Sequence, residues 1–214
     1  AGWTPHIFSE PGVDLSAIDL PYTQHEKRLG VWHNWLYSVR AALDSGAENI
    51  LTIQDDTLFH PERRIFTESI LWPRATIGFI SLYTAKHYSY RKSGQKRYEQ
   101  EHLRQPGVNR VQTKSFWGAM ALVFHRSVLK QLVEHPIAQK WLGSPSKTNK
   151  QEVYEKRRQN TFLIQNSDTC IGRVLLRMGK DLMFVDPSPV QHISVHSSIG
   201  HGGNTGKRNC ERCA

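Results

Sequence analysis

Short apolar runs alternate with helical patterns along much of the chain. Runs rich in β-branched and aromatic residues predict buried strands at 6–9, 50–53, 75–83, 117–124 and 181–186. In other segments apolar residues recur at helical spacing, which predicts helices at 31–43, 62–72, 128–133 and 167–178. Helices that alternate with buried strands are typical of α/β proteins, and so we expect a mixed sheet flanked by helices.

No composition shift along the chain marks a boundary between domains. A length of 214 residues suits one domain, and we expect 1–214 to fold around a single core. The stretches 13–27 and 189–200 are polar and contain turn-forming residues, which predicts loops, and 203–214 is expected to be a polar tail.

The segment 86–114 is basic and contains several aromatic residues. Its cations and rings are Lys86, Tyr88, Tyr90, Arg91, Lys92, Lys96, Arg97, Tyr98, His102, Arg104, Arg110 and Lys114. Such a composition suits the binding of phosphate groups or the stacking of bases. A solvated insertion between two strands would have the same composition, and the sequence does not decide between these two interpretations.

The chain also carries a strong excess of positive charge overall. There are 28 Lys and Arg residues against 19 Asp and Glu residues, which gives a net charge of +9 and a pI of about 9.6. A basic surface attracts polyanions such as nucleic acid or nucleotide phosphates. The sequence contains no apolar run of transmembrane length and no recognisable signal peptide, and we expect a cytoplasmic protein. Since residue 1 is Ala rather than Met, we also expect a trimmed N-terminus.

The three cysteines do not form a disulfide framework, because their number is odd. Cys210 and Cys213 have the CxxC spacing that suits zinc or redox chemistry. A zinc site needs further ligands, and His201 is a candidate. The alternative is a polar, frayed C-terminal tail in which the two thiols have no structural role.

The most informative feature is a pair of acids at the end of a buried strand. Asp55 and Asp56 follow the apolar run 50–53 directly, and neighbouring carboxylates repel each other unless a positive group lies beside them. A hard divalent cation with oxygen ligands would supply that positive charge. An ordinary turn after the strand, where Asp is common, is the alternative.

Three later residues can join this acid pair. In α/β proteins ligands gather at the carboxyl ends of the strands. Asp168 lies in the first turn of the predicted helix 167–178, where it is either a general base or an acid favoured by the helix dipole. His192 and His196 lie in the expected C-terminal loop, where either could bind a cation.

Taken in order, these motifs resemble the GT-A-type glycosyltransferases, and in particular the N-acetylglucosaminyltransferase IV-like group with its bacterial and phage relatives. The segment 54–56 (QDD) is similar to their acidic metal motif, and 116–124 (FWGAMALVF) with Arg126 is similar to a later strand near donor and acceptor. The segment 191–198 (QHISVHSS) resembles their C-terminal QHxGxxSS-like segment, although Ser194 replaces the glycine. The segment 28–32 (RLGVW) with Asn34 resembles the helix that follows their first strand, and the resemblance extends from about residue 2 to 203.

The resemblance implies a GT-A-like, Rossmann-like fold and a role for each matching residue. Asp56, with His192 or His196, would bind Mn²⁺ or Mg²⁺, and Asp168 would be the general base of an inverting transfer. A nucleotide sugar, expected to be UDP-linked, would contact the remaining matching residues, which are Arg28, Asn34, Asp55, Trp117 and Gly118. For Trp117 a place in the core is the alternative. The family's first nucleotide-binding strand is expected before residue 2.

Two classes of function therefore compete. The first is a metal-dependent, inverting glycosyltransferase whose acceptor is a polyanion such as modified DNA or a phosphorylated glycan. The second is a basic nucleic-acid-binding module without catalysis, supported by the net charge of +9 and by the segment 86–114. Asp55 and Asp56 favour the first class, because acids at a strand end repel phosphate unless a cation bridges them. A phosphodiesterase-like hydrolase would want more metal ligands.

Overall fold

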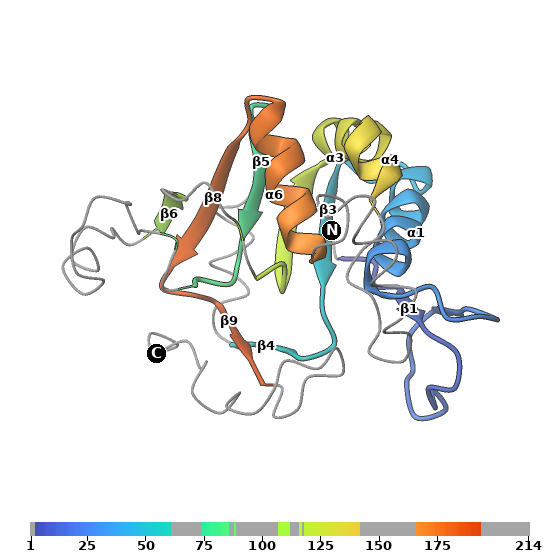
Figure 1. The fold of residues 1–214 in the computed structure, drawn as a ribbon. Coiled ribbons are helices and arrows are strands. Elements are labelled where there is room, and N and C mark those ends of the chain that lie inside the picture. The colour runs from blue at the N-terminus through green and yellow to red at the C-terminus, as the bar shows by residue number, and fades with distance from the viewer. Residues whose placement is uncertain are drawn as a thin grey trace, which may run out of the picture.

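A five-stranded mixed sheet forms the centre of the protein, as seen in a computed structural model (Figure 1). The structure describes residues 3–60, 74–85, 88, 107–111, 116, 118–141 and 166–193. The strands lie in the order β3 (Asn49–Ile53), β7 (Ala121–His125), β5 (Ile77–Ser81), β8 (Asp181–Asp186) and β6 (Gly107–Arg110). β5 and β8 are parallel, and the other neighbouring pairs are antiparallel. The expected mixed α/β architecture is therefore confirmed.

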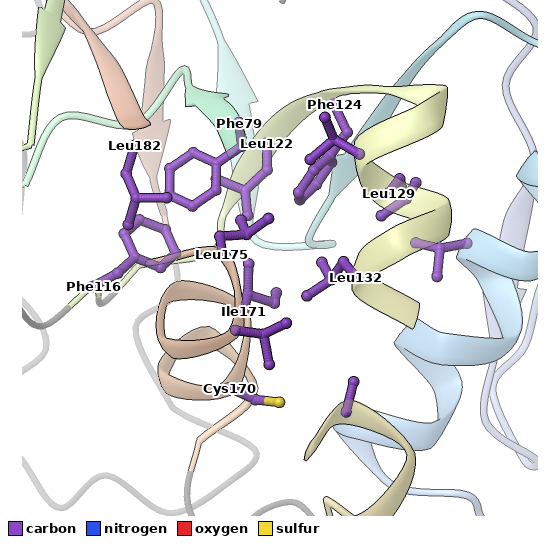
Figure 2. Packing of buried hydrophobic residues seen from close by; sticks show 14 of the residues in the cluster. Phe79, Phe116, Leu122, Phe124, Leu129, Leu132, Cys170, Ile171, Leu175 and Leu182 are labelled. Carbon is purple, nitrogen blue, oxygen red and sulfur yellow. The ribbon is translucent and has the colours of Figure 1, made fainter. Parts of the chain in front are cut away.

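The described helices pack against one face of this sheet. They are α1 (Val31–Asp44), α3 (Arg126–Glu134), α4 (Pro136–Lys140) and α6 (Ser167–Arg177). All four helices contribute buried side chains to one large hydrophobic cluster. Figure 2 shows its centre, where Leu129 and Leu132 of α3 and Ile171 and Leu175 of α6 face Leu122 of the sheet. This packing buries the apolar stripe of each helix, which is the main source of helix stability in proteins.

Side chains alternate along the strands, and the core therefore consists of two clusters, one on each face of the sheet. Leu122 and Phe124 of β7 belong to the helix-covered cluster, whereas Ala121 and Val123 belong to a smaller cluster on the other face. The smaller cluster also contains Val190, which follows β8. Successive residues of a strand point to opposite faces, and so both faces of the central strands are apolar.

Pro136 separates α3 from α4. The chain ends α3 at Glu134, passes through His135 in an extended conformation, and begins α4 with Pro136 at its first position. Proline lacks the N–H that a continuing helix needs but fits the first turn of a new one. The Nδ1 atom of His135 accepts a hydrogen bond from the Ile137 backbone N–H at 3.1 Å and thereby caps α4. Proline thus ends the first helix as predicted and also starts a second, which the sequence did not indicate.

Two small sheets complete the described fold. β1 (Ile7–Ser9), which was predicted, pairs in parallel with β2 (Tyr22–Gln24). β4 (Thr57–Phe59) pairs antiparallel with β9 (Val190–His192), below the main sheet in Figure 1. Neither small sheet was expected, because β2 and β9 lie in the predicted loops 13–27 and 189–200. Such three-residue strands carry no periodic signal, and distant pairing partners decide whether they form.

Two further expectations need correction. The strand predicted at 117–124 begins only at Ala121, because Gly118 has a φ of 102° that interrupts extended backbone. The basic segment 86–114 is not wholly an insertion, since β6 within it is an edge strand of the main sheet. Other expectations lie outside the described residues, namely the helix at 62–72, residues 86–87, 89–106 and 112–114 of that segment, Trp117, His196, His201, Cys210, Cys213 and the tail at 203–214.

Cys170 and Gly172 show how tightly α6 packs against its neighbours. Cys170 is buried, and this burial raises the pKa of its thiol to about 12, so the thiol stays protonated near neutral pH. A Cβ atom added at Gly172 would lie 2.6 Å from the Cβ atom of Phe116. Because that contact joins two main-chain-bound carbon atoms, the backbone would have to shift to relieve it.

We therefore expect Gly172→Ala to lower the free energy of unfolding by about 1–3 kcal/mol through overpacking. Helix propensity alone would raise the free energy of unfolding by about 1 kcal/mol. The sign of the measured change therefore tests the close approach of Gly172 to Phe116. Urea denaturation is the measurement, and Lys130→Ala at an exposed position of α3 is the control, expected to stay within about 0.5 kcal/mol of the wild type. A stabilised Gly172→Ala variant would contradict the close approach of α6.

Candidate functional site

The strand directions bring the candidate residues to one edge of the main sheet. β3, β5 and β8 end at this edge, whereas β7 begins there, because β7 is antiparallel to β3 and β5. Asp55 and Asp56 follow β3, and Gly118 precedes β7. Helix α6 begins at the same edge, since a hydrogen bond joins Asp168 in its first turn to Gly118. This is the edge at which α/β proteins place their ligands.

The two acids after β3 occupy the centre of a tight turn. The backbone N–H of Thr57 donates to the carbonyl of Gln54 at 3.2 Å, which closes a turn over Asp55 and Asp56. The carbonyl of Met120 accepts from both ends of this turn, from the Gln54 N–H at 2.8 Å and from the Thr57 hydroxyl at 3.3 Å. The turn interpretation of the acid pair is therefore correct as a description of the backbone, and it leaves the cation interpretation open.

The turn places Asp56 against His192, which is 136 residues later in the sequence. Nε2 of His192 lies 2.8 Å from Oδ2 of Asp56, within hydrogen-bond distance. The pairing of β4 with β9 sets this contact, because Thr57 lies opposite His192 and the Ile193 N–H donates to the Asp56 carbonyl at 2.9 Å. The side chains of Asp56 and His192 are 30% and 21% exposed, so both are accessible to a small ligand.

A hydroxyl group before β9 helps to hold His192 in place. Ser188 is buried, and its hydroxyl donates to the carbonyl of Leu82 and accepts from the N–H of Thr84. The carbonyl of Pro189 accepts from the N–H of His60 at 3.0 Å. The segment that leads into β9 is thus fixed both to the end of β5 and to the end of β4. Nothing in the sequence indicated this role of Ser188, because a single serine in a polar stretch belongs to no motif and no periodic pattern.

One oxygen atom of Asp56 distinguishes this pair from a simple ion pair. Oδ1 is buried and has no hydrogen-bond partner in the part of the chain that the structure describes. A buried carboxylate oxygen without a partner is costly, and a cation bound there would remove this cost. Carboxylate oxygen suits Mn²⁺ and Mg²⁺, and imidazole nitrogen is a common ligand of divalent transition metals. The pair therefore fits a divalent cation, although the described residues contain no cluster of three His, Cys, Asp or Glu side chains.

Asp168 is held by two backbone N–H groups. Its Oδ1 accepts from the N–H of Thr169 at 2.8 Å, and its Oδ2 accepts from the N–H of Gly118 at 2.9 Å. The first bond is local to the start of α6, as expected for an acid favoured by the helix dipole. The second connects α6 to the loop before β7.

Arg28 lies just before α1, and Asn34 lies in the first turn of that helix. The side chain of Asn34 joins α1 to β1, because its amide donates to the Phe8 carbonyl at 3.2 Å and its Oδ1 lies 2.9 Å from Nε2 of His25. Arg28 is exposed. No contact among the described residues brings either side chain to Asp56 or His192. Asn34 thus has a structural role that the resemblance did not indicate.

Glu10 is a second residue that the sequence analysis missed. Its two carboxylate oxygens accept from the N–H groups of Leu29 and Gly30, at 2.9 and 2.7 Å. These N–H groups lie next to the first turn of α1, where a negative charge is favoured by the helix dipole. Glu10 therefore supplies the residues just before α1 with a carboxylate acceptor for each N–H group.

A buried tyrosine lies beside Gly118. Tyr88 is fully buried between Phe116 and Phe184, with ring centroids 5.7 and 5.4 Å away. Burial raises the pKa of the Tyr88 phenol well above its usual range. A hydrogen bond with Ser81 partly opposes this rise, and the charges of Tyr83 and Asp168 add smaller contributions in the same direction as burial. Tyr88 consequently stays neutral next to the candidate base.

Comparison of the chain with models of known protein families and with curated proteins finds no match in either case. Among the described residues, no helix is long and apolar enough to cross a membrane.

The bond from the Thr57 hydroxyl to the Met120 carbonyl should stabilise the turn. We expect Thr57→Val to lower the free energy of unfolding by about 1 kcal/mol, because it removes the hydroxyl donor to the Met120 carbonyl. Thr52→Val is the matched control, since the Thr52 hydroxyl is buried without a described partner and its loss should be neutral or stabilising. Both variants can be compared by urea denaturation, and equal effects would refute the role of Thr57.

Proposed function

We propose that this protein is a metal-dependent, inverting glycosyltransferase that moves a sugar from a nucleotide-sugar donor to an acceptor hydroxyl. The observation that carries the proposal is the contact of Asp56 with His192, together with the buried Asp56 oxygen that lacks a partner. An acid pair at a strand end, an imidazole and a carboxylate at a helix start all gather at the same edge of the sheet. The resemblance to GT-A-type enzymes supports the same assignment.

Asp56 and His192 would hold the cation, which is Mn²⁺ or Mg²⁺. Such an ion supplies charge neutralisation for the diphosphate that leaves with the nucleotide. Asp55 is exposed at the tip of the same turn, where it can contact the donor. We assign the donor as UDP-linked on the resemblance alone.

Asp168 would act on the acceptor. Its carboxylate accepts the proton of the acceptor hydroxyl, and the acceptor oxygen then attacks the anomeric carbon on the face opposite the leaving diphosphate. The bond from that carbon to the diphosphate oxygen breaks as the new glycosidic bond forms, which inverts the configuration. The two N–H groups on Asp168 favour its charged form, the form that a base requires.

The acceptor is proposed to be a polyanion, because the protein carries a net charge of +9. Modified DNA and a phosphorylated glycan both meet this description. A basic nucleic-acid-binding module without catalysis shares the charge argument but gives no role to the contact of Asp56 with His192. A thermal-shift screen with nucleotide diphosphates, UDP-sugars and duplex DNA, each with and without Mn²⁺, separates the two functions. Stabilisation by DNA alone would favour the binding module.

The cation site can be tested without knowledge of the acceptor. We expect Asp56→Asn and His192→Ala each to weaken Mn²⁺ binding at least about 10-fold, because each removes a ligand. Electron paramagnetic resonance of free Mn²⁺ during titration measures the affinity. Asp44→Asn, which removes an exposed acid at the end of α1, is the control for net charge. Unchanged affinity in Asp56→Asn would rule out the proposed site.

The base can be tested by a substitution that keeps the shape of the side chain. We expect Asp168→Asn to lower the rate of sugar transfer by about 10²–10⁴-fold, because the amide cannot accept the hydroxyl proton. Donor affinity should change less than about 2-fold, since binding and proton transfer are separate contributions. Asp181→Asn, at the opposite edge of the sheet, is the control. A collapse of donor affinity would instead identify Asp168 as a donor-binding residue.

A further inference from the structure

Gly118 occupies a position that only glycine can fill without strain. Its φ of 102° lies in a region that other residues rarely adopt. A Cβ atom added there would also lie 3.1 and 3.2 Å from the Cδ1 and Cε1 atoms of the Tyr83 ring and 3.4 Å from the Tyr88 hydroxyl. Backbone conformation and close approach thus require glycine for independent reasons.

Gly118 is hydrogen-bonded to Asp168. The N–H of Gly118 donates to Oδ2 of Asp168 at 2.9 Å, across 50 residues of sequence. The Thr169 N–H, at the start of α6, fixes the other oxygen. A helix-start bond alone would leave the carboxylate anchored only to its own helix. The bond from Gly118 fixes it relative to the loop that leads into the central strand β7.

Aromatic side chains pack closely behind Gly118. Tyr88 is fully buried and stacks on Phe116 with an interplanar angle of 27°, and the Tyr83 ring lies against the position that a Gly118 Cβ would take. Since cores are close-packed, small displacements of such residues are costly. A displacement of the Gly118 N–H group would therefore disturb this packing.

We propose that Gly118 is a positioning residue for Asp168, whose backbone N–H holds the carboxylate in the orientation that accepts the acceptor proton. This inference rests on the proposed function, in which Asp168 is the base. It replaces the donor contact that the resemblance implied for Gly118. The two roles are separable, because a donor contact acts on substrate affinity whereas positioning acts on the rate of proton transfer.

The first test compares two glycine substitutions. We expect Gly118→Ala to lower kcat by about 100-fold, because displacement of a catalytic group by about 1 Å has an effect of this size. The donor KM should stay within about 2-fold of the wild type. The acidic limb of the pH–rate profile should move to higher pH, since the carboxylate loses a donor that favours its charged form.

Gly46→Ala is the matched control. Gly46 has a φ of 83°, so alanine there meets a similar backbone penalty, but no atom lies within 4 Å of its added Cβ. Gly46 lies between α1 and the start of β3, at the edge of the sheet opposite the candidate site. This variant should lose stability with unchanged kcat and an unchanged pH–rate profile. A rise in donor KM that accounts for the whole loss in Gly118→Ala would overturn the positioning role.

A second measurement does not depend on activity. In the wild type, the amide resonance of Gly118 should shift with pH as the Asp168 carboxylate takes up a proton, and Asp168→Asn should abolish this shift. If the shift occurs but the wild type transfers no sugar, the Asp168–Gly118 contact stands and the proposed function fails. If the Gly118 resonance does not respond to pH, the contact is absent in solution and the inference is wrong, whatever the activity.

Discussion

The carbonyl of Met120, immediately before β7, fixes the turn that carries Asp55 and Asp56. Pairing of β7 with β3 brings this carbonyl to the end of β3, where it accepts from the Gln54 N–H and the Thr57 hydroxyl. These bonds end the buried strand and close the turn over Asp55 and Asp56. β4 begins at the end of this turn and pairs with β9, and this pairing brings His192 to Asp56. One backbone acceptor thus connects the core to the candidate site.

Two carboxylates at this edge are stabilised in different ways. Asp168 receives an N–H group on each oxygen, from Gly118 and from Thr169, and lies at the favourable end of a helix dipole. Asp56 receives an imidazole on one oxygen, whereas its other oxygen is buried without a described partner. The Asp56 oxygen that lacks a described partner is the physical basis for proposing a cation there. The two N–H groups that favour the charged form of Asp168 are the basis for proposing it as the proton acceptor.

The longer elements could be predicted because their signals are local. The apolar faces of α1, α3 and α6 and the β-branched runs of β3, β5 and β8 follow from the spacing of neighbouring residues, and these elements formed near the expected positions. The short strands β2 and β9 could not be predicted, since their hydrogen-bond partners come from β1 and β4. Likewise, Gly118 shortened β7 through a positive φ. Local apolar character alone cannot indicate such a conformation.

The sequence by itself determined the mixed α/β class, the position of the acid pair after a buried strand, and the placement of Asp168 in the first turn of a helix. Each of these depends on residues close together in the chain. Only the tertiary structure decided that Asp56 meets His192, that Gly118 holds Asp168 and that Asn34 joins α1 to β1. These contacts connect residues that are far apart in sequence, and their geometry exists only once the strands have paired and the helices have packed.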